Sequence, residues 1–519
     1  MPSTEVDNTE AKAGMSADKA GVKPTVAFRP QDRALYDSKV TLEEYMYYAS
    51  KTRAEEDANA AQEPKTTLRD ILFPSGGKAH LASTESTGAL DQLKDVNLNK
   101  AENRTAVSAL EWTNASRALR SASAAAAFYL ITTDILGPFG VGFALGTMGW
   151  GQGIALFTVF GACAGCSGYL LWKVFLHVDS YEFAARNYGD LAFRIWGRWF
   201  RHVFNVLQVI QLTLSVGLIV ISNGQSISQV SKFRLCYIVC CLIWALAGFV
   251  VGQIRTLNKL GLLANWAILI NLFIMFISMG VMAELQHPRD FLKAMWGAQL
   301  FIYVCYMVYG CYVYFWQGQY ANQISYQGLS PYAWQTVCNV LAVVSGIIAA
   351  VLYGNIGIKV VYNNVLVELL HAPPLYTRQG KVLWAAIVPL YWSVAFVLAA
   401  AIPDFFGLVS VTAAVCAVQF TYTFPALLGL GLFVKRGAMV GEPGFDPATG
   451  EVRRRDSGVR RFARGFFGKY LWLNVVLLVY MLGSLAVSGL GSYSAISSLI
   501  SAFKTPQVTA FRCRSPLEG

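Results

Sequence analysis

Ten apolar runs of membrane-spanning length follow Arg120, and these runs constrain the fold more than any other feature of the sequence. About 20 apolar residues in a helix cross the hydrocarbon core of a bilayer, because each residue adds about 1.5 Å. A helix also satisfies its own backbone hydrogen bonds, which lipid cannot do. We therefore predict an all-α, multi-pass membrane protein. The predicted spans are residues 121–147, 151–176, 201–226, 235–253, 261–283, 297–316, 333–358, 382–402, 406–434 and 471–495.

Composition agrees with this class of protein and argues against others. The 519 residues are 55% hydrophobic and only 14% charged, which is typical of an integral membrane protein. The net charge of +11 lies largely in short loops beside spans, so it indicates membrane topology and no nucleic-acid partner. The ten cysteines lie mostly in apolar segments, which favours packing over a disulfide framework. No paired His/Asp or Ser/His set lies within the spans, so we expect neither an enzyme nor a bound metal or cofactor.

A break interrupts the first predicted span near its centre. Pro138 lacks a backbone N–H, and the glycines beside it weaken the helix further. Freed backbone groups at that depth are tolerated only where they are packed in protein or line a wet cavity. Broken helices of this kind form substrate and ion sites in secondary transporters, and a kink that serves packing alone is the alternative.

The break and the third span supply the candidate site residues. Unpaired N–H groups at residues 138–142 attract a substrate carboxylate through hydrogen bonds and the helix dipole. Asp134 is the one carboxylate expected near mid-membrane. It has three alternative roles: pairing with an ammonium group, carrying a coupling proton, or capping the helix. The predicted substrate-binding residues are Thr133, Asp134, Gly137, Pro138, Phe139, Gly140, Phe143, Gln208 and Gln211.

The third span carries a narrow polar stripe. Helical geometry brings Gln208, Gln211, Ser215, Ser222 and Ser226 within about 60° of one another. A stripe this narrow faces the interior of a helix bundle, where it either joins helices by hydrogen bonds or lines a substrate path.

The placement of charge is inconsistent with ten spans. With the N-terminus in the cytosol, the basic loops of the first half fall inside, as the positive-inside rule requires. Continuing through ten spans places fourteen Lys and Arg residues of the second half outside, nine of them in the loop 435–470, and none inside. One further crossing between residues 283 and 284 reverses each of these assignments. The sequence therefore behaves as though a span were absent there.

Several ordered segments between about Leu119 and Phe503 match a known pattern. They are Asp134–Pro138 with Phe143–Ala144 and Met148–Trp150, then Arg186–Arg194, Ile254–Asn258, His287–Trp296, Tyr353–Lys359 and Phe420–Pro425. In this order and spacing they resemble the amino acid/auxin permease family, and closely the fungal neutral amino acid permeases. Many of those relatives carry a proline where this chain has Gly142.

The resemblance implies a LeuT-like inverted-repeat helix bundle of the APC superfamily, with two five-helix repeats and an eleventh helix. Here Ala283 runs directly into Glu284, so the sixth of the eleven helices, the partner of the broken first one, is lacking. The implied function is secondary active transport of neutral amino acids by alternating access, coupled to protons or sodium. Asp134, Ser345 and Asn355 are the candidate ion-coupling residues. A transport-inactive truncated or splice form, or a nutrient-sensing membrane protein, is the alternative.

Two tails and one basic loop are expected outside the spans. We predict that residues 1–115 form a cytosolic, largely disordered tail with an amphipathic helix at 42–54. Residues 504–519 are predicted to form a short C-terminal tail. Residues 116–503 form the transporter domain. The Arg-rich segment 453–464 predicts contact with anionic lipid at the cytosolic surface. The usual address of the family favours the plasma membrane over a vacuolar membrane.

Overall fold

The computed structural model describes residues 36–60, 138–253, 291–504 and 511–517, apart from a few isolated positions within these ranges. Most of the predicted span 121–147 and all of the predicted span 261–283 lie outside the described residues. The site candidates Thr133, Asp134 and Gly137 lie outside them as well.

The described helices agree with the predicted spans. Seven helical segments are long and apolar enough to cross a membrane, and α10 is shorter. This confirms the all-α, multi-pass prediction for the described part of the chain, whose β structure is one bridge between Phe445 and Val452. The seven segments are α7 (Trp150–Val178), α9 (Arg198–Val230), α13 (Phe291–Gln317), α14 (Tyr332–Val361), α15 (Arg378–Ala401), α16 (Phe405–Thr412) with α17 (Phe424–Gly437), and α19 (Leu471–Ala502), and the shorter helix is α10 (Tyr237–Val251).

Shorter elements begin, interrupt or join these helices. The described part of the first span consists of a 3-10 turn and one short helix. Three π-helical turns interrupt or end regular helix in the second half of the chain. The shorter elements are α1 (Leu42–Ala60), η1 (Pro138–Gly140), α6 (Val141–Met148), α8 (Tyr188–Trp196), η3 (Gly318–Tyr320), η4 (Ser325–Gly328), η5 (Tyr362–Val367), η6 (Ala413–Ala417), η7 (Gln419–Thr423) and α18 (Gly458–Phe466).

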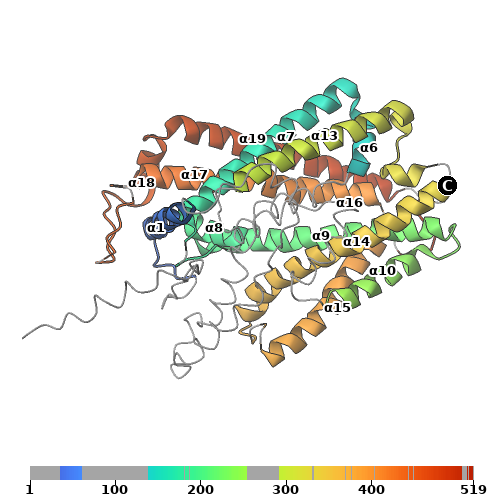
Figure 1. The fold of residues 1–519 in the computed structure, drawn as a ribbon, viewed down its shortest axis with the longest axis horizontal. Helices are drawn as coiled ribbons and strands as arrows, with labels where there is room; N and C mark the ends of the chain where they lie inside the picture. The colour runs from blue at the N-terminus through green and yellow to red at the C-terminus, as the bar shows by residue number, and fades with distance from the viewer. Residues whose placement is uncertain are drawn as a thin grey trace, which may run out of the picture.

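Helices α7 and α13 lie side by side and run antiparallel (Figure 1). Gly165 and Gly168 on α7 leave room for the side chains of Trp296 and Met295 near the start of α13. Midway along the pair, the hydroxyls of Thr158 and Tyr303 are 2.7 Å apart. Small residues permit such close approach in lipid, where the hydrophobic effect does not drive helices together.

The helices form a bundle with two distinct ends. We call the end that carries α1, α8 and α18 the basic end (Figure 1). There Lys435 at the end of α17 donates a hydrogen bond to the carbonyl of Ile195 in α8. We call the other end the disulfide end, because a bond between Cys236 and Cys513 joins the start of α10 to the C-terminal segment there.

The disulfide corrects the expectation that the cysteines serve packing alone. Cys236 and Cys513 are 277 residues apart, so no local spacing announces their pairing. Nearby, Phe511 N donates to the carbonyl of Ala400 at 2.9 Å, which fixes the C-terminal segment a second time. The other eight cysteines are free thiols, and Cys163 and Cys166 are among them.

Basic loops of both halves lie at the basic end. Arg201 near the start of α9 forms an ion pair with Glu368 beyond η5, with a nitrogen–oxygen distance of 2.6 Å. The end of α10 also lies here, since Gln253 donates to the carbonyl of Ala385 in the first half of α15. The start of α13 packs on the same hydrophobic cluster as α8. The described basic loops of both halves of the sequence therefore share one end of the bundle.

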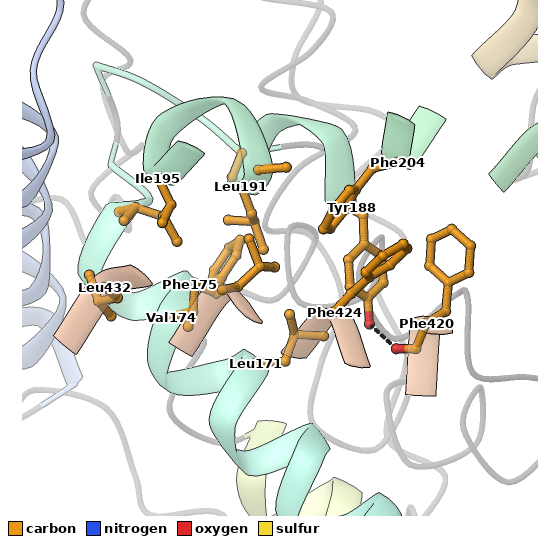
Figure 2. Packing of buried hydrophobic residues seen from close by; sticks show 14 of the residues in the cluster. Leu171, Val174, Phe175, Tyr188, Leu191, Ile195, Phe204, Phe420, Phe424 and Leu432 are labelled. Atoms are coloured by element: carbon orange, nitrogen blue, oxygen red, sulfur yellow. Dashed lines mark hydrogen bonds between the residues drawn. The ribbon is translucent and has the colours of Figure 1, made fainter. Parts of the chain in front are cut away.

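Hydrophobic packing at the basic end joins α7, α8, α9 and α17 (Figure 2). Leu171, Val174 and Phe175 of α7 face Leu191 of α8. The ring of Phe204 on α9 stacks on Phe424 at the start of α17, with centroids 3.8 Å apart. Aromatic stacking of this kind adds to the packing that holds helices together in lipid. A second cluster, between α9, α10, α14 and α15, surrounds the buried Trp384 and Trp392.

Candidate functional site

The described part of the first predicted span begins with a 3-10 turn at the predicted break. Pro138, Phe139 and Gly140 form η1, and α6 follows directly. These elements lie against the second half of α13. Gly142 sits so close to Val313 that a Cβ at this position would overlap the valine side chain. The glycine is therefore required by the approach of two helices, which explains why a small residue stands there.

Phe139 points into a cluster of aromatic rings. Its ring lies edge-on to Tyr326, at 5.0 Å between centroids, and to Tyr309, at 5.9 Å. Tyr326 belongs to η4, which lies in the loop between α13 and α14, and Tyr309 belongs to α13. The hydroxyls of Tyr309 and Ser325 are 2.6 Å apart. Phe139 is a predicted site residue, whereas the two tyrosines were not predicted because they lie far from it in sequence.

These rings line a cavity of about 530 Å³ between η1, α13, η4 and the start of α14. Among the described residues no Asp, Glu, Lys or Arg lines it. Gln317 brings a polar group to its wall, and the buried Oε1 of this residue has no hydrogen-bond partner in the described part of the chain. The cavity is therefore aromatic, uncharged and supplied with a few polar groups, as small-molecule sites commonly are.

A hydrogen-bond network fixes η4 over this cavity. Gln327 in η4 donates to Ser226 Oγ at 3.3 Å, and its carbonyl accepts from Gln229 at 3.1 Å and from Gln335 at 2.7 Å. Asn339 on α14 donates to Gln229 at 2.9 Å. Two roles are predicted for the polar stripe of α9, namely hydrogen bonding between helices or lining a substrate path. For its outer residues, represented by Ser226, the structure shows hydrogen bonding between segments.

Gln208 and Gln211 lie deeper on the same helix. They are 5% and 6% exposed, and the Oε1 atom of each is buried without a hydrogen-bond partner among the described residues. Their helical spacing from Phe204 places them on the face that meets the π-helical region before α17. A buried amide oxygen without a donor is costly, so a ligand that donates hydrogen bonds would be favoured there.

The remaining candidates are Phe143 in α6, and Ser345 and Asn355 in α14. Phe143 packs edge-on against Phe406 at the start of α16, with 5.0 Å between ring centroids, and does not line the cavity. Ser345 and Asn355 are buried in α14, each 2% exposed. The structure thus groups Phe139 with Tyr309 and Tyr326, and places the two glutamines of α9 in a separate environment.

The π-helical turns were not predicted from the sequence. In η7, residues Gln419–Thr423 precede Pro425, which has no N–H to donate to the carbonyl of Thr421. The lost hydrogen bond accounts for the local change in helical winding. Such turns occur frequently at functional sites because they redirect side chains and free backbone carbonyls.

The described residues form a multi-pass helical membrane protein, and those that line the cavity beside η1 and α6 are uncharged. Residues 120–283 and 278–439 match the family model of the transmembrane amino acid transporter protein, and the two matches together cover more than half of the chain. The chain therefore belongs to this family of transmembrane amino acid transporters.

Two fungal proteins described as transmembrane transporters are similar to this chain. The protein of Fusarium pseudograminearum is 24% identical over 303 residues, which are 48% of this chain and 62% of the relative. The protein of Gibberella moniliformis is 23% identical over 294 residues, which are 46% of this chain and 61% of the relative. The matches thus span less than two thirds of the length of either relative.

Proposed function

We propose that this protein is a secondary active transporter of neutral amino acids, working by alternating access in a LeuT-like bundle. The observation that carries the proposal is the uncharged aromatic cavity beside the interrupted first helix, in a chain that belongs to an amino acid transporter family. A charged substrate side chain would lose its hydration there without gaining a counter-ion from the described lining residues. A neutral side chain is buried against aromatic rings at no such cost.

The polar ends of the substrate find complementary groups close by. Backbone N–H groups at residues 138–142 are the partners proposed for the carboxylate. The faces of Phe139, Tyr309 and Tyr326 attract an ammonium group through cation–π interaction. The buried amide oxygens of Gln208 and Gln211, in a separate environment on α9, are further acceptors proposed for the substrate.

Coupling to a proton gradient, with sodium as the second candidate ion, is assigned to Asp134, Ser345 and Asn355. Burial of Ser345 and Asn355 in α14 supports a site sheltered from water. The proposed location is the plasma membrane, with the N-terminus in the cytosol. The basic loops at one end of the bundle support this orientation.

Uptake by purified full-length protein in proteoliposomes tests this proposal. With an imposed pH gradient we expect saturable uptake of neutral amino acids and at least tenfold less uptake of lysine and glutamate. Asp134→Asn should abolish the response to the gradient, whereas Tyr309→Ala should raise KM and Tyr309→Phe should not. Equal uptake of charged and neutral amino acids would contradict the assigned substrate class.

A transport-inactive form is the second candidate, and one observation favours it. The family match divides into two pieces that overlap at residues 278–283, beside the junction of Ala283 and Glu284 where the charge pattern lacks a span. Amplifying the transcript across these two codons distinguishes the candidates. A longer product that encodes a further apolar stretch supports a complete transporter, while a product with this junction and no measurable uptake supports the inactive form.

A further inference from the structure

The N-terminal helix α1 is docked at the basic end and is not a solvated tail (Figure 1). It spans residues 42–60, which include the predicted helix 42–54, and it packs against α7 and α8. Leu42 and Met46 are buried in the cluster that includes Leu171 of α7 and Leu432 of α17. Tyr45 is 2% exposed and meets Phe183 edge-on at 5.0 Å.

Glu43 joins α1 to the loop between α17 and α19. Its side chain is only 3% exposed, and Arg454 approaches it at 3.3 Å while Arg461 of α18 forms a second ion pair with it. Burying a carboxylate is costly unless charged partners compensate it. The two arginines therefore make the docked position of α1 specific.

A second contact joins α1 to the end of α7. Arg53 forms an ion pair with Asp179 at 3.2 Å, and the two side chains are 9% and 2% exposed. The other carboxylate oxygen of Asp179 accepts a hydrogen bond from Ala185 N at 2.9 Å. Arg53 thus connects α1 with the segment that leads from α7 to α8.

Tyr36, just before α1, extends these contacts to α9 and α14. Its hydroxyl donates to Asp190 of α8 at 2.8 Å, and the guanidinium of Arg201 lies 3.6 Å from its ring centroid. Arg201 in turn holds both carboxylate oxygens of Glu368, beyond the end of α14, at 2.7 and 2.6 Å. One short segment therefore contacts the α7–α9 connection, the α17–α19 loop and, through Arg201, the end of α14.

We propose that residues 36–60 act as a clamp that holds the basic end of the bundle closed, and that the clamp must loosen before this end opens. Alternating access requires that elements at one end separate and later return. Residues 36–60 bind elements from both halves of the sequence at once, so separation of those elements breaks the contacts of Glu43 or Arg53. This regulatory role rests on the proposed transport function, whereas the closed state of the basic end can be measured without transport.

The experiment uses the full-length protein in lipid nanodiscs and hydrogen exchange detected by mass spectrometry. The variant Glu43→Gln removes the charge that Arg454 and Arg461 hold, and Arg454→Gln with Arg461→Gln removes the same contacts from the other side. Ser50→Lys is the matched control, because Ser50 is an exposed residue of α1 and the substitution changes the net charge by the same unit as Glu43→Gln. Peptides from residues 36–60, 179–197 and 453–466 report on the clamp and on the two segments that it joins.

We expect Glu43→Gln to speed exchange about tenfold in all three segments, since the loss of charge-assisted hydrogen bonds loosens them together. The arginine variants should give the same increase, the combination of all three substitutions no more than either alone, and Ser50→Lys none. Faster exchange confined to residues 36–60 would overturn the clamp, because α1 would then be a passively docked helix. Unchanged exchange in every segment would overturn it too.

Uptake in proteoliposomes separates this proposal from the proposed function. If the protein transports, we expect a several-fold higher initial rate for Glu43→Gln than for wild type. Loosened segments with an unchanged or lower rate would contradict the inhibitory role of the clamp. Absence of uptake from wild type and all variants would refute transport, while the exchange experiment would still decide whether the clamp closes the basic end.

Discussion

At the scale of single residues, close approach explains choices that hydrophobicity cannot. Gly142 stands where the first span meets Val313 of α13, and Gly310 stands where α13 meets Val141. The two glycines bring the interrupted helix and α13 together around the ring of Phe139. Their role depends on a neighbour that is more than 150 residues away, so their sequence positions alone suggest only flexibility.

The substitution Gly142→Ala should therefore destabilise the protein. The added methyl group overlaps Val313, and overpacking of this kind costs about 1–3 kcal/mol. Thermal unfolding of the purified protein measures the effect, with Gly151→Ala as the control because nothing lies near a Cβ at that position. Adding Val313→Ala to Gly142→Ala should restore most of the loss, and a failure to restore it would argue against this contact.

At the scale of elements, helix α1 and the described C-terminal segment are fixed by side chains from distant parts of the sequence. Helix α1 is held by Glu43 and Arg53, and the C-terminal segment is held by Cys513. Neither attachment could be predicted from the local sequence pattern of hydrophobic and polar residues. The sequence predicted a helix at 42–54 from its amphipathic spacing, yet its docking site is built from α7, α8 and α18. Periodicity reports which face of a helix is apolar and not what covers that face.

The docking of α1 should depend on pH through Glu43. Burial alone would raise the pKa of this carboxyl, but hydrogen bonds from Arg454 and the charge of Arg461 outweigh burial and hold the pKa below its usual 4.5. The contribution of Glu43 to docking is therefore complete above pH 4.5 and is lost as the pH falls through the lowered pKa. Hydrogen exchange of residues 42–60, corrected for the intrinsic pH effect, should show docking intact at pH 6. Release of α1 already at that pH would contradict this assignment.

The disulfide between Cys236 and Cys513 can be counted directly. Denatured, unreduced protein should react with eight equivalents of a maleimide, and reduced protein should react with ten. The variant Cys513→Ser should give nine without reduction, and unfolding should become easier by about 2–4 kcal/mol because the unfolded chain loses a long-range constraint. The variant Cys305→Ser removes a free thiol and serves as the control. Ten equivalents in unreduced wild type would refute the bond.

At the scale of the whole molecule, two independent features distinguish the ends of the bundle. Basic loops collect at one end, which the positive-inside rule assigns to the cytosol. The disulfide lies at the other end, and disulfides persist on the side of a membrane that faces an oxidising space. Both features therefore support the proposed orientation, in which α1 lies in the cytosol and the C-terminal segment lies on the other side of the membrane.

Epitope tags test this orientation. In intact cells, an antibody should reach a tag after Gly519 but not one before Met1, because the proposed orientation puts the two tags on opposite sides of the membrane. Permeabilised cells should stain equally for both tags, which controls for expression. Staining of the N-terminal tag in intact cells would invert the orientation, and it would place the disulfide on the reducing side.

The amino-acid sequence alone was sufficient to predict the class of protein, most of the described helices and the 3-10 turn that begins at Pro138. These features follow from local chemistry, since hydrophobic length and the missing N–H of proline act within a few residues. The contacts of Tyr309 and Tyr326 with Phe139, the packing of Phe143 on Phe406 and the pairing of Cys236 with Cys513 became visible in the three-dimensional fold. The tertiary structure also decided that Glu43 is buried between two arginines. Each of these depends on which helices lie side by side, and that choice is made by packing between segments hundreds of residues apart.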